Sequence, residues 1–252
     1  MSFDVSGSAY DRFMGPFARR LAPVFADFAG IHDGTVVDVG CGSGILTEEL
    51  ARRVGEKNVA AADPSPLLEA CAARVPGADV RSGTAEALPW PDGSFDAAVS
   101  QLVLHFLDDQ VAGLAEMGRV VRPGGIVAAN SWNFPKMQFL STFWDSAREL
   151  VPSAPAEVQP IETLEQLGGL GRDAGLEDVE TVPIGVSVQY ESFAELWQLF
   201  ELGVGPAGEY YASLPPETRE AVRDGYRRRL GDPQGGFTLT AQAWAVRGRR
   251  AA

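Results

Sequence analysis

Apolar runs alternate with helically spaced segments along the first half of the chain. Short, mostly apolar runs are typical of buried strands, and they are found at 35–39, 58–63, from 79 onward, 95–104 and 125–132. Apolar residues recur at helical spacing between them, which predicts helices at 45–54, 66–75 and 111–121. This alternation predicts a doubly wound α/β fold, with a parallel sheet, helices on both faces and right-handed crossovers.

Outside residues 33–131 the pattern changes. An apolar stripe at 8–28 has nearly helical spacing, but Pro16 and Pro23 should break or bend a helix there. The other elements that we expect are helices at 136–151, 163–174 and 192–230, and strands at 178–188 and 237–246. The two late strands predict an antiparallel hairpin that closes one edge of the sheet. We therefore expect a single domain, in which the helical segments 8–28, 132–175 and 189–232 lie over the active site.

Composition and charge narrow the possible partners. With 45% hydrophobic and 22% charged residues the chain is typical of a globular protein, and no apolar run reaches the length of a membrane helix. A net charge of −13 disfavours nucleic acid, because its phosphates would be repelled. The N-terminal stretch lacks the basic and apolar regions of a secretory signal. Two cysteines and two histidines favour a cytoplasmic setting and give no metal-ligand spacing, while the oligomeric state stays undetermined.

The stretch VVDVGCGSG at 36–44 has glycines at alternate positions where a strand should pass into a helix. Glycines there let the backbone approach a ligand, and the first N–H groups of the helix face it, as in nucleotide-binding folds. The dinucleotide fingerprint needs its third glycine where this chain has Ile45, which disfavours a pyrophosphate. Asp63 ends the second strand, where an acid can accept hydrogen bonds from ribose hydroxyls. Together these features predict a ligand with an adenosine-like moiety.

Four motifs occur in a characteristic order: VVDVGCGSG, AADPS, GTAEALPWPDGSFDAAVSQLVLHF and VVRPGG. In this order and spacing, over residues 33–131, the chain resembles class I S-adenosylmethionine-dependent methyltransferases. It is most similar to the small-molecule branch related to ubiquinone and menaquinone biosynthesis, and YDRFMG and FTLTAQAWAVRG resemble bacterial members. The resemblance implies a seven-stranded, mostly parallel, Rossmann-like methyltransferase fold with an antiparallel last strand. It also implies S-adenosyl-L-methionine as cofactor and in-line methyl transfer to a small-molecule acceptor.

The resemblance also implies roles for individual residues. It places the methionine part of the cofactor against Gly40, Cys41 and Gly42, with Asp38 orienting that loop, and the ribose against Asp63. The remaining implied cofactor contacts are Pro64, Ser65, Ala85 and Glu86 at the adenine, Gln101 near the reaction centre, and Tyr10 and Arg19 at the methionine carboxylate.

Simpler structural roles remain open for several of these residues. Asp38 could cap the following turn, Asp63 could be a helix N-cap ahead of Pro64, and Cys41 suits packing better than nucleophilic attack. His105 lies near the expected methyl group, and its ordinary pKa of about 6.5 suits a general base, but the same position often serves to pack or hydrogen-bond a loop.

Aromatic residues are concentrated after the fifth expected strand and in the late insertion. Helically spaced aromatics usually form a core, but both segments connect at the carboxyl ends of strands, where open α/β sheets bind ligands. We therefore hypothesise an acceptor pocket roofed by Trp132, Phe143, Trp144, Trp197 and Tyr210.

Two other functions are compatible with parts of the sequence. One is a module that binds S-adenosylmethionine for regulation without catalysing a reaction, and an open second pocket beside the sulfonium would argue against it. The other is a nicotinamide-dependent oxidoreductase, which Ile45 and the adenine loop disfavour.

Overall fold

The computed structural model describes residues 11–155 and 157–252. The strands are β1 (Val36–Val39), β2 (Val59–Ala62), β3 (Asp79–Arg81), β4 (Phe95–Gln101), β5 (Val121–Trp132), β6 (Leu176–Tyr190) and β7 (Phe237–Arg250). The α-helices are α2 (Gly15–Ala29), α3 (Ile45–Val54), α4 (Leu68–Arg74), α5 (Gln110–Val120), α6 (Gln138–Leu150), α7 (Leu164–Asp173), α8 (Phe193–Glu201), α9 (Gly205–Ser213) and α10 (Pro216–Arg229). Short 3-10 helices are η1 (Glu56–Asn58), η2 (Leu104–Phe106) and η3 (Phe134–Lys136).

The strands form one seven-stranded sheet in the order β3-β2-β1-β4-β5-β7-β6. The first five strands in this order run parallel, and β7 pairs antiparallel with both β5 and β6. This confirms the expected doubly wound sheet with an antiparallel last strand. The chain order reverses between β1 and β4, and such a switch point opens a crevice at the carboxyl ends of the two strands.

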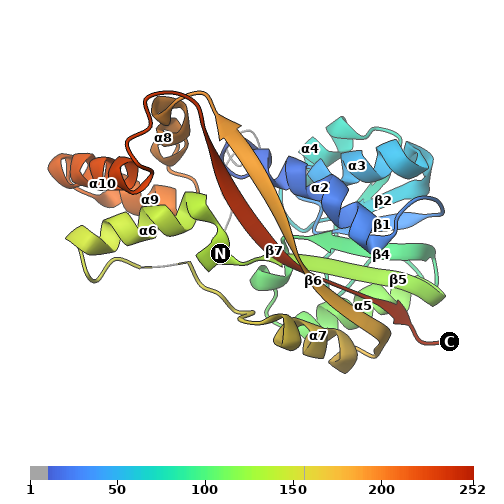
Figure 1. Ribbon diagram of the computed structural model, residues 1–252. Coiled ribbons are helices and arrows are strands. Elements are labelled where there is room, and N and C mark those ends of the chain that lie inside the picture. Colours follow the sequence, from blue (N-terminus) through green and yellow to red (C-terminus); the bar gives the residue numbers. More distant parts are fainter. Residues whose placement is uncertain (1–10, 156) are drawn as a thin grey trace.

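Helices cover both faces of the sheet (Figure 1). The helices α2 and α3 pack on one face against side chains such as Val36, Val99 and Ala128. The helices α5 and α7 pack on the other face against alternate residues such as Val37 and Val127. Because successive strand residues point to opposite faces, apolar runs are needed to bury a sheet on both sides, as the sequence pattern predicts.

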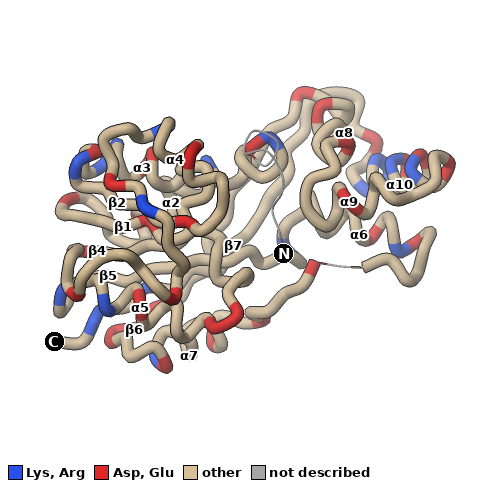
Figure 2. Tube along the Cα trace, turned by 180° about the vertical axis from the view of Figure 1, so that it is seen from behind, with Lys and Arg blue, Asp and Glu red and all other residues tan. Residues whose placement is uncertain are grey.

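A group of helices lies beyond the end of the parallel strands (Figure 1). The strands β6 and β7 extend away from the sheet, and α8, α9 and α10 are inserted between them, as expected for residues 192–230. There α10 packs against α6, which follows β5. Figure 2 shows basic and acidic residues intermingled on α10.

Two of the differences from the sequence expectation affect elements beside the cavity. The helix α2 runs unbroken from Gly15 to Ala29: Pro16 occupies its first turn, where proline is tolerated, and the helix continues past Pro23. The strand expected at 95–104 ends at Gln101, because Leu102 takes a left-handed backbone conformation with φ of 64°. The chain then continues as η2, so the residues after Gln101 leave the sheet.

None of the helices in the described ranges combines the length and the apolarity needed to cross a bilayer.

Candidate functional site

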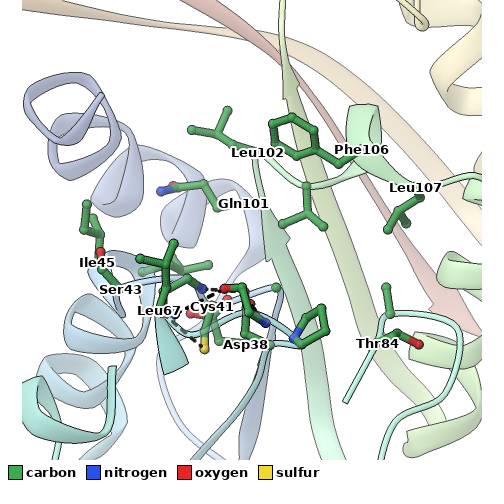
Figure 3. Close-up of a pocket in the computed structure, with 18 of the residues that line it drawn as sticks. Asp38, Cys41, Ser43, Ile45, Leu67, Thr84, Gln101, Leu102, Phe106 and Leu107 are labelled. Atoms are coloured by element: carbon green, nitrogen blue, oxygen red, sulfur yellow. Dashed lines mark hydrogen bonds between the residues drawn. The ribbon is translucent and has the colours of Figure 1, made fainter. Parts of the chain in front are cut away.

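A cavity of about 680 Å³ lies at the switch point between β1 and β4 (Figure 3). Its walls come from the loops after β1, β2 and β4, the loop after β3, and the adjoining ends of α2 and α3. This volume is within the range of small-molecule sites. Eleven of the residues predicted from the sequence line it: Asp38, Gly40, Cys41, Gly42, Asp63, Pro64, Ser65, Ala85, Glu86, Gln101 and His105.

The three glycines after β1 are required for different structural reasons. Gly40, Gly42 and Gly44 all have positive φ, at 74°, 50° and 85°. A Cβ on Gly40 would overlap the Val103 side chain, and one on Gly44 would lie 2.9 Å from the Sγ of Cys71. A Cβ on Gly42 would have only Leu67 nearby, at 3.9 Å. Two of the three glycines therefore serve internal packing, and only Gly42 leaves free space beside the cavity.

Asp63 connects the glycine loop to the loop after β2. One carboxylate oxygen accepts a hydrogen bond from the backbone N–H of Gly42 at 2.8 Å, and the other accepts from the N–H of Ser65 at 2.8 Å. The residue is 8% exposed, and it lines the cavity. Each carboxylate oxygen can accept a further hydrogen bond, so Asp63 can bind hydroxyl groups of a ligand while it holds the loop.

Asp38 is a buried acid beneath the glycine loop. Its Oδ2 accepts a hydrogen bond from the Thr47 hydroxyl at 2.6 Å, whereas its buried Oδ1 has no partner among the described residues. Burial raises the pKa of Asp38 to about 7, and the nearby charge of Asp63 adds to the effect. A buried acceptor without a donor is costly, so the site favours a ligand that brings a positive charge or a donor to this point.

The pKa of Asp38 makes the stability of the protein dependent on pH. Because the folded-state pKa exceeds the ordinary value of 3.8, Asp38 stabilises the fold below that value, and this contribution is lost as pH rises to about 7. We expect Asp38→Asn to remove this loss, which is on the order of 4 kcal/mol over the whole range from pH 3.8 to about 7. Urea unfolding at about pH 5 and about pH 8 checks this, and parallel pH profiles for the two proteins would contradict it.

The side chains after β4 form the opposite wall. The amide nitrogen of Gln101 donates to the backbone oxygen of Ala18 at 3.3 Å, while its buried Oε1 has no partner in the described part of the chain. His105 Nδ1 lies 3.2 Å from the Ser131 hydroxyl, and the ring contacts Phe106 and Phe134, with centroids 4.0 and 5.6 Å away. Burial lowers the pKa of His105 to about 4, so the imidazole is neutral near pH 7 and is a weaker base than a free histidine.

Cys41 behaves as a packing residue. It is buried together with Ala61 and Cys71, and the hydrogen bond with the Cys71 thiol, with burial as the second cause, raises the pKa of Cys41 well above its ordinary value. A thiol in this state does not ionise near neutral pH and is a poor nucleophile. The packing interpretation of Cys41 therefore fits the structure.

Arg119 on α5 holds the loop that carries Thr84, Ala85 and Glu86 into the cavity. Its guanidinium donates to the backbone oxygens of Leu88 and Trp90, at 3.2 and 2.9 Å. The same guanidinium pairs with Glu116 and Asp92. The sequence pattern does not mark Arg119, because Leu88, Trp90 and Asp92 are far from it in the chain and only Glu116 is close.

The structure describes only one of the two residues expected at the methionine carboxylate. Tyr10 lies outside the described residues. Arg19 is half-exposed, does not line the cavity, and pairs with Asp11 at 3.4 Å. Asp11 also pairs with Arg74 on α4 at 2.6 Å and accepts a hydrogen bond from Ser43 in the glycine loop. Asp11 therefore joins the chain before α2 to the glycine loop, and the sequence analysis missed it.

The aromatic residues expected to roof an acceptor pocket are placed in the core. Trp132, Phe143, Trp144 and Trp197 are at most 2% exposed, and Tyr210 is partly buried. Their rings pack against one another and against neighbours, for example Phe143 on Phe200 with centroids 4.7 Å apart. None of the five is among the residues that line this cavity, so an acceptor pocket roofed by them stays a prediction. Helical spacing could not separate the two roles, because core and pocket aromatics share it.

No group of three His, Cys, Asp or Glu side chains within residues 11–155 and 157–252 is arranged to hold a metal ion.

Comparison with known proteins identifies similar sequences. Residues 37–129 match the family described as methyltransferase domain. An uncharacterized methyltransferase of Mycobacterium bovis is 31% identical over 144 residues, covering 52% of this chain and 73% of that protein. A malonyl-acyl-carrier-protein O-methyltransferase of Halorhodospira halophila is 27% identical over 271 residues, which cover 98% of this chain and 87% of that protein. A demethylmenaquinone methyltransferase of Desulfitobacterium hafniense is 36% identical over 127 residues, which cover 47% of this chain and 50% of that protein.

Solved structures share the fold. The YcgJ protein of Bacillus subtilis has a TM-score of 0.57 at 17% identity, covering 92% of this chain and 98% of its own. The cyclase SpnF has a TM-score of 0.57 at 21% identity, and the match covers 93% of this chain and 82% of that one. At such identities these likenesses concern the architecture alone.

Proposed function

This chain belongs to the methyltransferase family, and from that premise we propose that its cavity binds S-adenosyl-L-methionine for methyl transfer to a small-molecule acceptor. The observation that carries the cofactor assignment is the set of buried acceptors at the switch point. Asp38 Oδ1 and Gln101 Oε1 have no partner among the described residues, and both residues line the cavity with Asp63. A ligand that carries an ammonium group, a sulfonium and two ribose hydroxyls supplies the donors and the positive charge that this set favours.

Different residues of the cavity would bind different parts of the cofactor. Asp63 would accept hydrogen bonds from the ribose, and Asp38 with Gln101 would meet the positively charged methionine end. The adenine would lie against Pro64, Ser65, Ala85 and Glu86, with Leu67 and Leu107 supplying apolar surface. Arg119 supports this end indirectly by holding the loop after β3. These assignments agree with the roles that the family resemblance implies.

When bound, the cofactor supplies an electrophilic methyl group on a positively charged sulfur. The main task of this chain is then to align the acceptor and keep water out, and such positioning can lower a barrier by roughly 7–11 kcal/mol. Leu102 and Phe106 give the β4 side of the cavity an apolar surface beside Gln101 (Figure 3). Val103 also lines the cavity. A nitrogen or sulfur acceptor needs no strong base, whereas an oxygen or carbon acceptor has a proton to lose.

His105 is the residue that we propose as general base for an acceptor of the second kind. Since its pKa is about 4, the ring is neutral over the range in which most enzymes work, so the rate should not fall between about pH 8 and 6. We expect His105→Gln to bind S-adenosylhomocysteine as the wild type does and to lose about 100-fold or more in kcat. Isothermal calorimetry and a labelled-methyl assay check the two parts, and unchanged turnover would reject the base assignment.

Two measurements test the proposed function. Calorimetry should show binding of S-adenosylhomocysteine and no binding of NAD, and the reverse result would overturn the cofactor assignment. A transfer assay with labelled S-adenosylmethionine should then screen acceptor classes, including quinols, carrier-bound acids, amines and polyketides. Two of these classes follow the names of the relatives, which are enzymes for malonyl-acyl-carrier protein and demethylmenaquinone. Binding without transfer to any class would favour the non-catalytic module instead.

A further inference from the structure

The wall of the cavity after β4 begins with an unusual backbone conformation. Among the described residues, three that are not glycine have positive φ: Leu102 at 64°, Asp178 at 50° and Asp232 at 53°. Of these, only Leu102 lines the cavity. A left-handed conformation is sterically unfavourable for a branched, bulky residue, whereas asparagine and aspartate tolerate it better. Such a conformation persists only where the surrounding structure imposes it, and such residues are concentrated at functional sites.

Asn130 on the neighbouring strand imposes the conformation of Leu102. The backbone N–H of Leu102 donates to the side-chain Oδ1 of Asn130 at 3.0 Å and to its backbone oxygen at 3.2 Å. Asn130 is fully buried in β5, opposite Gln101 in the parallel ladder. Its side chain thus captures the N–H of the first residue that leaves β4. If this acceptor were lost, the buried N–H would keep a single, longer hydrogen bond.

The turn at Leu102 determines where the following residues lie. Six residues after β4 line the cavity: Leu102, Val103, His105, Phe106, Leu107 and Asp108. Figure 3 shows Leu102, Phe106 and Leu107 along the side of the cavity away from Asp38 and Cys41. A straight continuation of β4, as the sequence pattern predicts, would not bring this set of side chains to the cavity mouth.

The same turn joins this wall to the glycine loop. The side chain of Val103 occupies the space that Gly40 leaves free, so that a Cβ on Gly40 would overlap it. The wall after β4 and the loop after β1 are therefore in direct contact. A shift of residues 102–108 would remove Val103 from Gly40 and change the distance between the two sides of the cavity.

We propose that Asn130 is a positioning residue for the cofactor cavity. Its side-chain oxygen holds Leu102 in the left-handed conformation, and Leu102 in turn holds the wall 102–108 against the glycine loop. Asn130 itself does not line the cavity, so it acts through Leu102. This inference rests on the proposed function, because it takes the cavity to be the site of S-adenosylmethionine.

The test is a double-mutant cycle between Asn130 and Leu102, read by calorimetry with S-adenosylhomocysteine. Asn130→Leu keeps the size of the side chain and removes the acceptor, and we expect it to weaken binding by about tenfold or more. Glycine takes a left-handed conformation without steric penalty, so in the L102G background the same change should cost less than about threefold. Equal losses in both backgrounds would overturn the proposal.

Asn133→Leu provides a matched control. Asn133 is also buried and lies three positions further along, but its amide bonds to Gln242 at 2.9 Å and it does not line the cavity. We expect this variant to keep the wild-type affinity within about threefold, even if it is less stable. A loss as large as that of Asn130→Leu would show that any buried asparagine near the end of β5 has the same effect, and would reject the specific role of Asn130.

A measurement on the unmodified protein covers the case in which Asn130→Leu does not fold. The amide proton of Leu102 should exchange with solvent at least about 100-fold more slowly than that of Phe106, because Leu102 is buried with two acceptors, whereas Phe106 is 44% exposed and its N–H bonds to Val103 within the short η2. Equal exchange rates would overturn the proposal. Failure of the wild type to bind S-adenosylhomocysteine would instead contradict the proposed function, and the exchange result would still show whether the N–H of Leu102 is held at Asn130.

Discussion

Replacing Asp63 by alanine is expected to weaken the binding of S-adenosylhomocysteine by about 100-fold or more. Hydrogen bonds to a charged acceptor are worth about 1.5–3 kcal/mol each, and the carboxylate would lose two from the ribose. The substitution would also free the backbone N–H groups of Gly42 and Ser65, which donate to the Asp63 carboxylate at 2.8 Å in the wild type. The loss therefore combines a missing ligand contact with a loosened glycine loop, and calorimetry at a temperature well below the unfolding midpoint measures it.

Asp96→Ala is a suitable control for this variant. Asp96 accepts hydrogen bonds from the backbone N–H and the hydroxyl of Thr35, at 2.6 and 3.0 Å, just before β1 begins. It therefore has a similar structural role at the opposite end of the strand and does not line the cavity. We expect Asp96→Ala to lower stability and to leave affinity within about threefold of wild type. Near-normal binding by Asp63→Ala would remove the ribose assignment.

The second large effect is expected for Gly44→Ala. The alanine would have to adopt φ of 85°, which costs roughly 1–2 kcal/mol. Its Cβ would also lie 2.9 Å from the Sγ and 3.0 Å from the Cα of Cys71, and such overpacking costs roughly 1–3 kcal/mol more. Because the second of these atoms is backbone, the contact is relieved only if α4 moves away from the glycine loop. We expect a free energy of unfolding about 2–5 kcal/mol lower, measured by urea denaturation.

Gly124→Ala separates the two causes. Gly124 has φ of 76°, and a Cβ there would meet nothing within 4 Å, so only the backbone penalty applies. The difference between the two variants isolates the contact with Cys71, and adding Cys71→Ala to the Gly44 variant should recover part of it. If Gly44→Ala cost no more than Gly124→Ala, close packing of α4 against the loop would not explain Gly44.

The alternation of apolar runs and helical stripes predicted most elements of the fold. The helix expected at 45–54 is α3, and the order of the strands along the chain is as predicted. The pattern could not predict where β4 ends, because LVL at 102–104 is as apolar as the strand before it. There the N–H of Leu102 bonds to Asn130, which is remote in sequence, and the chain turns out of the sheet.

Local sequence also left the roles of individual side chains open. The sequence showed where the glycines lie but not why a side chain is excluded there. Val103 and Cys71, which leave no room for a Cβ at Gly40 and Gly44, belong to other segments of the chain. For the same reason Arg119 and Asp11 were missed, since most of their partners are remote in the chain. The acceptor pocket stays a prediction, because a buried aromatic and a ligand-facing one follow the same helical period.

What this sequence determined by itself is therefore the part encoded locally: the period of each element, the strand-to-helix glycine turn, and the acid at the end of β2. These features depend on backbone preferences and burial patterns that a short window contains. The tertiary structure alone decided which side chains meet at the cavity, which acceptors stay without a donor, and where the wall after β4 lies. Those properties depend on contacts between β1, β4, β5 and α4, and such contacts exist only once the sheet has brought distant segments together.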